Sequence, residues 1–94
     1  MNRTRDGEPA PVIVDLFSAA DCSLCRVALA DLAPLAKELG LVVHMVDIAG
    51  DPRLEARYRS RIPVAEIRGH TVFKYELDEA RLREMVARVR GSGG

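Results

Sequence analysis

Two short runs of apolar residues lie on either side of a helical pattern in the first half of the chain. Residues 12–17 are apolar on nearly both faces, which is typical of a strand buried in the middle of a sheet, and residues 41–48 form a second such run. Between these runs, apolar residues recur at helical spacing: Leu24, Ala28, Leu29, Leu32, Leu35, Ala36 and Leu39. A strand, a helix and a second strand in this order form a βαβ unit, so we expect the two strands to be parallel.

The ends of this predicted helix carry recognisable signals. Asp21 is a candidate N-cap, because its carboxylate can accept hydrogen bonds from the free N–H groups of the first turn. Gly40 is a candidate for the left-handed residue that closes the helix. Pro34 lies inside the pattern and removes the hydrogen bond to the Ala30 carbonyl, so it predicts a kink or a split at this point.

The second half of the chain predicts a short helix followed by a hairpin. Asp51 is placed to cap a helix that has Pro52 in its first turn, where the missing N–H of proline costs nothing. Two strands follow at residues 64–68 and 71–75. Between them, Gly69-His70 has the two-residue form of a type II′ turn, with glycine first.

A last helix begins after Asp78, and its apolar stripe consists of Leu82, Met85, Val86 and Val89. The resulting order, βαβαββα, predicts an α/β fold with a four-stranded mixed sheet. We expect helices on both faces of this sheet, because the first strand has no polar face to show water. One domain is expected over residues 12–90, with flexible segments at residues 1–11 and 91–94.

Composition narrows the functional classes. The 94 residues leave room for one domain, and 14 basic side chains balance 14 acidic ones. This zero net charge argues against nucleic acid or an acidic membrane as a partner. No apolar run approaches the roughly 20 residues of a membrane span, and none follows Arg3 and Arg5 in the manner of a signal peptide. The cytoplasm is therefore the expected location.

The two cysteines lie in the sequence Cys22-Ser23-Leu24-Cys25, at the start of the first predicted helix. Thiol–disulfide exchange needs a thiolate to attack and a second thiol to resolve the mixed disulfide. A sulfur at a helix start faces free N–H groups and the positive end of the helix dipole, which favour the thiolate. Cys22 is therefore the predicted nucleophile and Cys25 the resolving thiol. We expect Arg26 to stabilise the thiolate further and the like charge of Asp21 to oppose it.

Two other interpretations of this motif are open. The pair can be half of a zinc site, but four ligands are usual and only His44 and His70 remain to complete the set. The cysteines can also be two buried thiols that pack as small apolar side chains. Their position directly after the first strand of a βαβ unit favours the redox interpretation over both.

With this motif at the first strand–helix junction and a proline opening the third strand, the chain resembles the thioredoxin superfamily, and more narrowly the small glutaredoxin-like proteins. The resemblance covers about residues 12–90 and is carried by residues 16–25, Val46-Asp47-Ile48, Asp51-Pro52 and Arg61-Ile62-Pro63-Val64. It implies that Ile62-Pro63 is a cis peptide beside the Cys22 sulfur. Backbone groups of Ile62 would then pair with a substrate chain or with glutathione, like an added strand.

The chain departs from the usual glutaredoxin pattern at several positions. Glutaredoxins commonly carry Pro-Tyr between the cysteines, where this chain has Ser23-Leu24, and a basic residue shortly before them, where it has Ala19-Ala20-Asp21. They also carry a glycine pair after the last strand, where this chain has Glu76-Leu77-Asp78. Both glutathione and a separate reductase are therefore open as the source of electrons.

Charged residues outside the motif suggest two further site candidates. Residues 1–50 carry 4 basic and 7 acidic side chains, whereas residues 51–94 carry 10 and 7. Arg57 and Arg61 are placed to receive carboxylates of glutathione or of an acidic partner, although a solvated arginine-rich helix face is the favoured explanation. Thioredoxins have a buried carboxylate below the cysteines that assists proton transfer, and Asp15 is the candidate for it here. A polar residue at the exposed end of the sheet is the commoner explanation.

The sequence thus predicts a small thiol–disulfide oxidoreductase that acts on protein or glutathione mixed disulfides as a monomer. This oxidoreductase is expected to need no bound cofactor or metal. Glutathione is a possible co-substrate and a reductase is a possible partner. Two alternatives come from other classes. One is a redox-inert thioredoxin-like module that binds a protein partner in the groove at Pro63. The other is a metal or iron–sulfur carrier in which Cys22 from each of two chains shares a cluster.

Overall fold

The computed structural model describes residues 11–92, and its elements follow the predicted order βαβαββα. The strands are β1 (Val12–Ser18), β2 (Leu41–Asp47), β3 (Val64–Ile67) and β4 (His70–Lys74). The helices are α1 (Ser23–Leu39), α2 (Pro52–Tyr58) and α3 (Glu79–Ser92). None of the helices within the described range is both long and apolar enough to cross a membrane.

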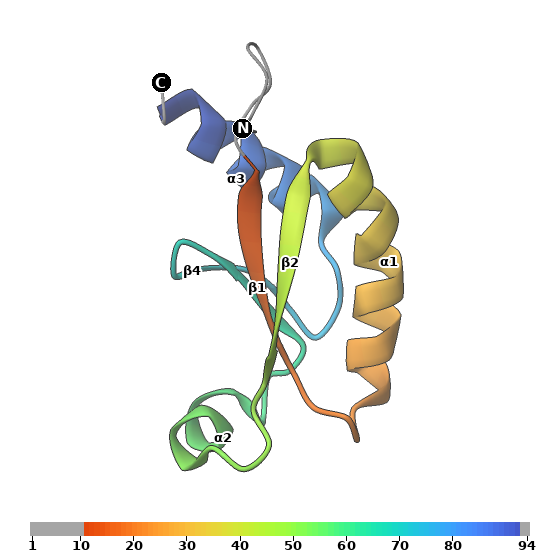
Figure 1. Cartoon of the computed structure of the whole chain (residues 1–94), viewed down its shortest axis with the longest axis vertical. Helices are drawn as coiled ribbons and strands as arrows, with labels where there is room; N and C mark the ends of the chain where they lie inside the picture. The colour runs from red at the N-terminus through yellow and green to blue at the C-terminus, as the bar shows by residue number, and fades with distance from the viewer. Residues whose placement is uncertain (1–10, 93–94) are drawn as a thin grey trace, which may run out of the picture.

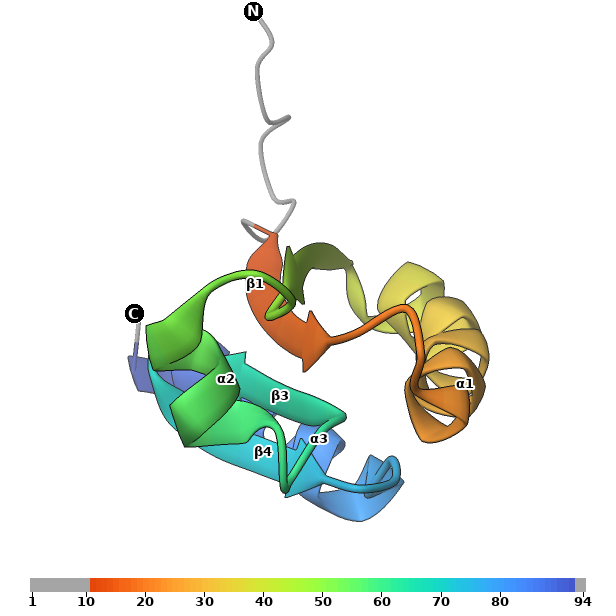
Figure 2. The same ribbon diagram turned by 90° about the horizontal axis from the view of Figure 1, so that it is seen from below.

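The four strands form one mixed sheet in the order β2-β1-β3-β4. β1 and β2 are parallel, as the βαβ prediction requires, whereas β3 is antiparallel to both β1 and β4. Helices α1 and α3 cover one face of the sheet and α2 covers the other (Figures 1 and 2). The predicted α/β architecture is therefore confirmed.

The two faces of β1 are covered unequally. Val14 and Leu16 are fully buried and pack with residues of α1 and α3 in the larger core cluster. On the opposite face Phe17 packs against α2, but Ile13 is 54% exposed. Strand β1 is therefore not buried on both faces along its whole length, as the sequence suggested, because α2 has only 7 residues and covers one end of its face.

The start of α1 corrects the predicted cap. The N-cap residue is Cys22, which is extended at φ −114° and ψ 107°, and its Sγ accepts a hydrogen bond from the backbone N–H of Cys25. Asp21 lies one position too early to cap this helix. At the other end Gly40 closes α1 at φ 71°, as predicted. Pro34 does not split the helix, which runs from Ser23 to Leu39 with buried residues on both sides of the proline.

The hairpin turn is displaced by one residue from the predicted position. Ile67 pairs with His70, so the two-residue loop is Arg68-Gly69 rather than Gly69-His70. Both loop residues have positive φ, 53° at Arg68 and 81° at Gly69. A type I′ turn requires a positive φ at both central residues, whereas a type II′ turn requires it only at the first.

The caps of the other two helices lie where the sequence placed them. The Asp51 carboxylate accepts hydrogen bonds from Arg53 and Leu54 N–H at 3.0 and 3.2 Å, and Asp78 accepts one from Arg81 N–H at 3.1 Å. Helix α3 continues through Gly91 and Ser92, which were expected to belong to a flexible tail. The rest of the predicted flexible segments, residues 1–10 and 93–94, lies outside the described residues.

The turn geometry predicts that Arg68→Asn stabilises the protein by about 0.5 kcal/mol, because asparagine tolerates the left-handed region better than arginine does. Urea unfolding followed by circular dichroism measures the change. Gly69→Ala is the opposite control and should destabilise by about 1 kcal/mol. A Cβ at Gly69 meets nothing within 4 Å, so the loss of stability would come from the left-handed backbone conformation and not from a steric clash. Destabilisation by Arg68→Asn would contradict the type I′ assignment.

Candidate active site

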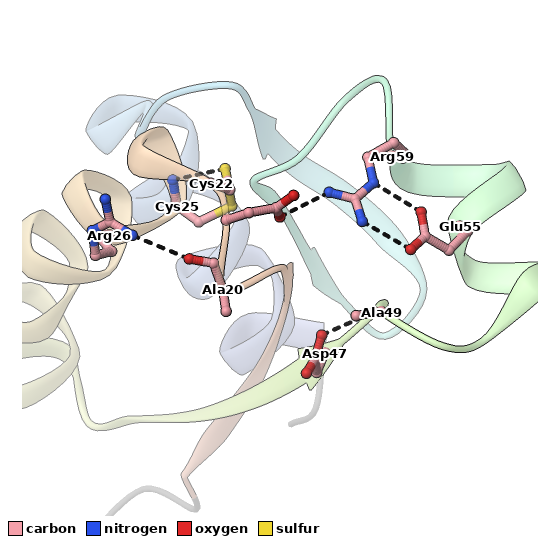
Figure 3. Close-up of polar contacts among 9 residues, drawn as sticks. Ala20, Cys22, Cys25, Arg26, Asp47, Ala49, Glu55 and Arg59 are labelled. Atoms are coloured by element: carbon pink, nitrogen blue, oxygen red, sulfur yellow. Dashed lines mark hydrogen bonds and ion pairs between the residues drawn. A yellow bond between two sulfur atoms is a disulfide. The ribbon is translucent and has the colours of Figure 1, made fainter.

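The cysteine pair lies where β1 leads into α1 (Figure 3). Cys22 and Cys25 are joined in a disulfide, with their Cα atoms 5.2 Å apart. Cys25 is only 4% exposed, whereas Cys22 is half-buried and is therefore the more accessible sulfur of the two. The attacking role of Cys22 and the resolving role of Cys25 stay predictions.

The local structure of α1 places a hydrogen-bond donor at the Cys22 sulfur. The Cys25 N–H points to Cys22 Sγ at an N···S distance of 3.1 Å, and the first turn of α1 contains no acidic residue. In the reduced protein this N–H and the positive end of the helix dipole would favour a thiolate over a thiol at this position.

Asp21 has a partner that the sequence did not indicate. Arg59, directly after the end of α2, donates from Nη1 to Asp21 Oδ1 at 3.0 Å. The same guanidinium donates from Nε and Nη2 to the two carboxylate oxygens of Glu55, each at 2.8 Å (Figure 3). The hydrogen bond and the charge of Arg59 lower the pKa of Asp21. The Glu55–Arg59 pair has helical spacing and can be found in the sequence, but nothing local connects position 21 with position 59.

Arg26 and Cys25 share a cavity on the side of the site toward β2. The Arg26 Nη1 donates to the Ala20 carbonyl at 3.1 Å, which ties the loop before the cysteines to the first turn of α1. The cavity has a volume of about 450 Å³ and is lined by Ser18, Ala19, Ala20, Cys25, Arg26, Leu29, Met45 and Asp47. Arg26 is thus placed on the side of the resolving cysteine.

The Ile62-Pro63 peptide is cis, as the resemblance implied. Ile62 is buried in a cluster that also contains Tyr58 and Val64, and Cys22 packs against this cluster. The Ile62 N–H donates to the Tyr58 carbonyl at 3.0 Å, and the Pro63 carbonyl accepts the Tyr75 N–H at 2.8 Å. The Ile62 N–H is thus already bonded within the protein, and the pairing of Ile62 with a substrate chain stays a prediction.

Comparisons with known proteins decide the family. The model of the Glutaredoxin-like domain (DUF836) matches residues 13–87. The chain belongs to this family. An uncharacterized protein of Mycobacterium tuberculosis H37Rv is 35% identical over 80 residues, which cover 80% of this chain and 82% of that protein.

Solved structures support the same assignment for this glutaredoxin-like chain. The solution structure of protein Ne2328 from Nitrosomonas europaea has a TM-score of 0.71 at 24% identity, over 90% of this chain and 98% of that one. Thioredoxin from Fasciola hepatica has a TM-score of 0.53 at 27% identity, over 85% and 82%. The chain is therefore a glutaredoxin-like member of the thioredoxin superfamily, and its Cys-x-x-Cys pair supports a thiol redox function.

In this glutaredoxin-like site, Arg57 and Arg61 lie over the ring of Tyr58. Their guanidinium carbons are 5.4 and 6.0 Å from the ring centroid, and Arg61 Nη2 donates to the Arg57 carbonyl. The Tyr58 ring also stacks on Phe17, with the ring centroids 4.0 Å apart, and the Tyr58 hydroxyl donates a hydrogen bond to Glu66 at 2.9 Å. Both arginines thus have a structural explanation, and neither is brought to the cysteines by these contacts.

Asp15 is not the buried carboxylate that the sequence suggested. Its side chain is 36% exposed and bonds to His44 Nδ1 at 2.9 Å, across to the edge strand β2. The buried carboxylate on this face is Glu66, 8% exposed and directly opposite Asp15 in the register of β1 and β3. The sequence feature that could have indicated a buried carboxylate here is that Glu66 is a single acidic residue within a short apolar strand.

The histidines do not complete a zinc site with the cysteines. His44 is bonded to Asp15, and His70 lies at the start of β4 next to the hairpin turn. Across residues 11–92 no three side chains of His, Cys, Asp or Glu gather in a way that could hold a metal ion.

The contact of Tyr58 with Glu66 predicts that Tyr58→Phe destabilises the protein by about 1–3 kcal/mol, because it leaves a buried carboxylate without its donor. Chemical unfolding in urea at neutral pH measures the loss. Tyr75→Phe removes the hydroxyl of an exposed tyrosine and should leave stability within about 0.5 kcal/mol of the wild type. Equal effects of the two substitutions would show that the Tyr58 hydroxyl contributes nothing.

Proposed function

We propose that this protein is a thiol–disulfide oxidoreductase that reduces or exchanges mixed disulfides of proteins or of glutathione. The observation that carries the proposal is the asymmetry of the cysteine pair. Cys22 is half-buried and its Sγ accepts an N–H at the start of α1, whereas Cys25 is buried one turn later. An accessible nucleophile beside a protected resolving thiol is what a two-step exchange requires.

The first step forms a bond between Cys22 and the substrate. The Cys22 thiolate attacks one sulfur of the substrate disulfide, and the other substrate sulfur leaves as a thiolate that takes a proton from water. The Cys25 N–H and the dipole of α1 stabilise Cys22 as attacking group, and again as leaving group when it is displaced. We expect the Ile62 carbonyl, next to the cis peptide, to accept an N–H of the substrate backbone.

In the second step Cys25 gives up its proton to water and attacks the Cys22 sulfur as a thiolate. The remaining substrate thiolate leaves and the Cys22–Cys25 disulfide forms, so two electrons have passed from the protein to the substrate. Two molecules of glutathione, or a dithiol reductase, return these electrons by the reverse exchange, and no resident cofactor is needed. We propose that the protein does this as a monomer in a reducing compartment, the cytoplasm.

Equilibration in graded glutathione redox buffers tests the proposal, with acid quenching and intact-mass measurement. We expect a reversible two-electron transition that either Cys→Ser substitution abolishes. Cys25→Ser should accumulate a glutathione adduct at Cys22, whereas Cys22→Ser should accumulate much less, because Cys25 is buried. A midpoint near −270 mV would resemble thioredoxin, and one of about −200 to −230 mV would resemble glutaredoxins.

Two outcomes of this experiment would contradict the proposal. Absence of any transition across the accessible range would favour a redox-inert binding module that uses the groove at Pro63. A coloured dimer on purification, with Cys22 unavailable to glutathione, would favour an iron–sulfur carrier.

A further inference from the structure

Arg59 connects two parts of the site that are far apart in the sequence. Its guanidinium contacts Glu55 of α2 (Figure 3). It also forms an ion pair with Asp21, which directly precedes Cys22. The segment that follows Arg59 leads within four residues to the cis Ile62-Pro63 peptide. The Asp21–Arg59 ion pair therefore joins the loop that holds the nucleophile to the segment that holds the cis proline.

This ion pair also alters the charge beside Cys22. Asp21 on its own would place a negative charge on the residue that directly precedes Cys22, and a like charge nearby disfavours a thiolate. Arg59 supplies a positive charge 3.0 Å from the Asp21 carboxylate, and Glu55 holds two other nitrogens of the same guanidinium. The Arg59 charge thus opposes the effect of Asp21 on the cysteine.

The other charged side chains around the pair have different partners. Arg26 is bonded to the Ala20 carbonyl and lies on the side of Cys25. Asp47 lines the same cavity, and its Oδ1 accepts the Ala49 N–H at 2.9 Å (Figure 3). Arg61 lies over the ring of Tyr58. Asp21 is the charged residue adjacent to Cys22 in the chain, and its charged partner is Arg59.

We propose that Arg59 is a positioning residue that sets the redox potential of the Cys22–Cys25 pair. It does so by compensating the negative charge of Asp21 and by fixing the orientation of the Asp21 side chain. The proposal rests on the proposed thiol–disulfide exchange. A thiolate exists only in the reduced protein, so a positive charge near Cys22 stabilises the reduced form relative to the disulfide. Loss of Arg59 should therefore make the pair a stronger reductant, and loss of Asp21 should make it a stronger oxidant.

The test compares Arg59→Gln, Asp21→Asn and the double variant in the redox buffers described above. Arg59→Gln should raise the pKa of Cys22 by about half a unit and shift the equilibrium about threefold toward the disulfide. That shift corresponds to a potential about 14 mV more negative. Asp21→Asn should shift both quantities in the opposite direction, and the double variant should return close to the wild type.

Shifts of the redox potential in opposite directions in the two single variants distinguish an electrostatic role of the ion pair from a merely structural one. Each single substitution breaks the same ion pair, so a role confined to holding the loop would move the potential in the same direction in both variants. A second measurement, the rate of Cys22 alkylation against pH, should show the same ordering of variants. High salt should bring all of them together, since these side chains are partly exposed.

Arg83→Gln is the matched control. Arg83 has the same arrangement as Arg59, with Glu79 four residues earlier in its own helix and a distant acid, Glu38, at 2.8 Å. Glu38 lies at the end of α1 opposite to the cysteines, so this control should leave the potential unchanged. The proposal about Arg59 would be overturned if the redox potentials of the two single variants moved in the same direction, or moved no more than that of Arg83→Gln. The wild-type transition would in that case still support the proposed function. Absence of a wild-type transition would instead overturn both.

Discussion

At the start of α1 a sulfur atom takes the place that an oxygen of Ser, Thr, Asp or Asn usually occupies in a helix cap. Cys22 is extended, and its Sγ accepts the Cys25 N–H, so the sulfur of the proposed nucleophile satisfies one of the free N–H groups of the first turn. The helix behind it is fixed by Ala28, Leu32 and Leu35, which are buried against the sheet. The direction of the N–H groups at the sulfur therefore depends on the packing of the whole helix and not on a mobile loop.

The opposite face of the sheet supplies the rest of the site. Tyr58 anchors α2 through its stacking on Phe17 and its hydrogen bond to Glu66, which join the end of the helix to β1 and β3. The residues that follow carry the Arg59 side chain to Asp21 and the Ile62-Pro63 peptide to the cluster against which Cys22 packs. A helix of two turns is enough for this purpose, because only the end of the sheet near the cysteines needs to be covered.

The sequence predicts the order of elements and the position of the cysteine pair correctly, because both depend on local patterns: apolar periodicity, caps and the spacing of two residues. Its prediction of Asp21 as the cap of α1 is wrong, since Cys22 caps the helix and the Asp21 carboxylate has a partner outside α1. That partner, Arg59, lies 38 positions away, and no local rule connects the two. The buried carboxylate Glu66 was likewise missed, because its partner, the Tyr58 hydroxyl, comes from another element. Asp15, the candidate from the sequence, is partly exposed and bonds to His44.

We expect the cap hydrogen bond of α1 to stabilise a Cys22 thiolate in the reduced protein. A pH titration of the reduced, ¹⁵N-labelled protein tests this expectation, by following the backbone amide of Cys25 in NMR spectra alongside the alkylation rate of Cys22. The Cys25 amide proton should move downfield as the thiolate forms, with the same midpoint as the alkylation rate and below the free cysteine value of about 8.5. A Cys25 amide that does not respond to the titration of Cys22, or a midpoint at or above that value, would contradict it.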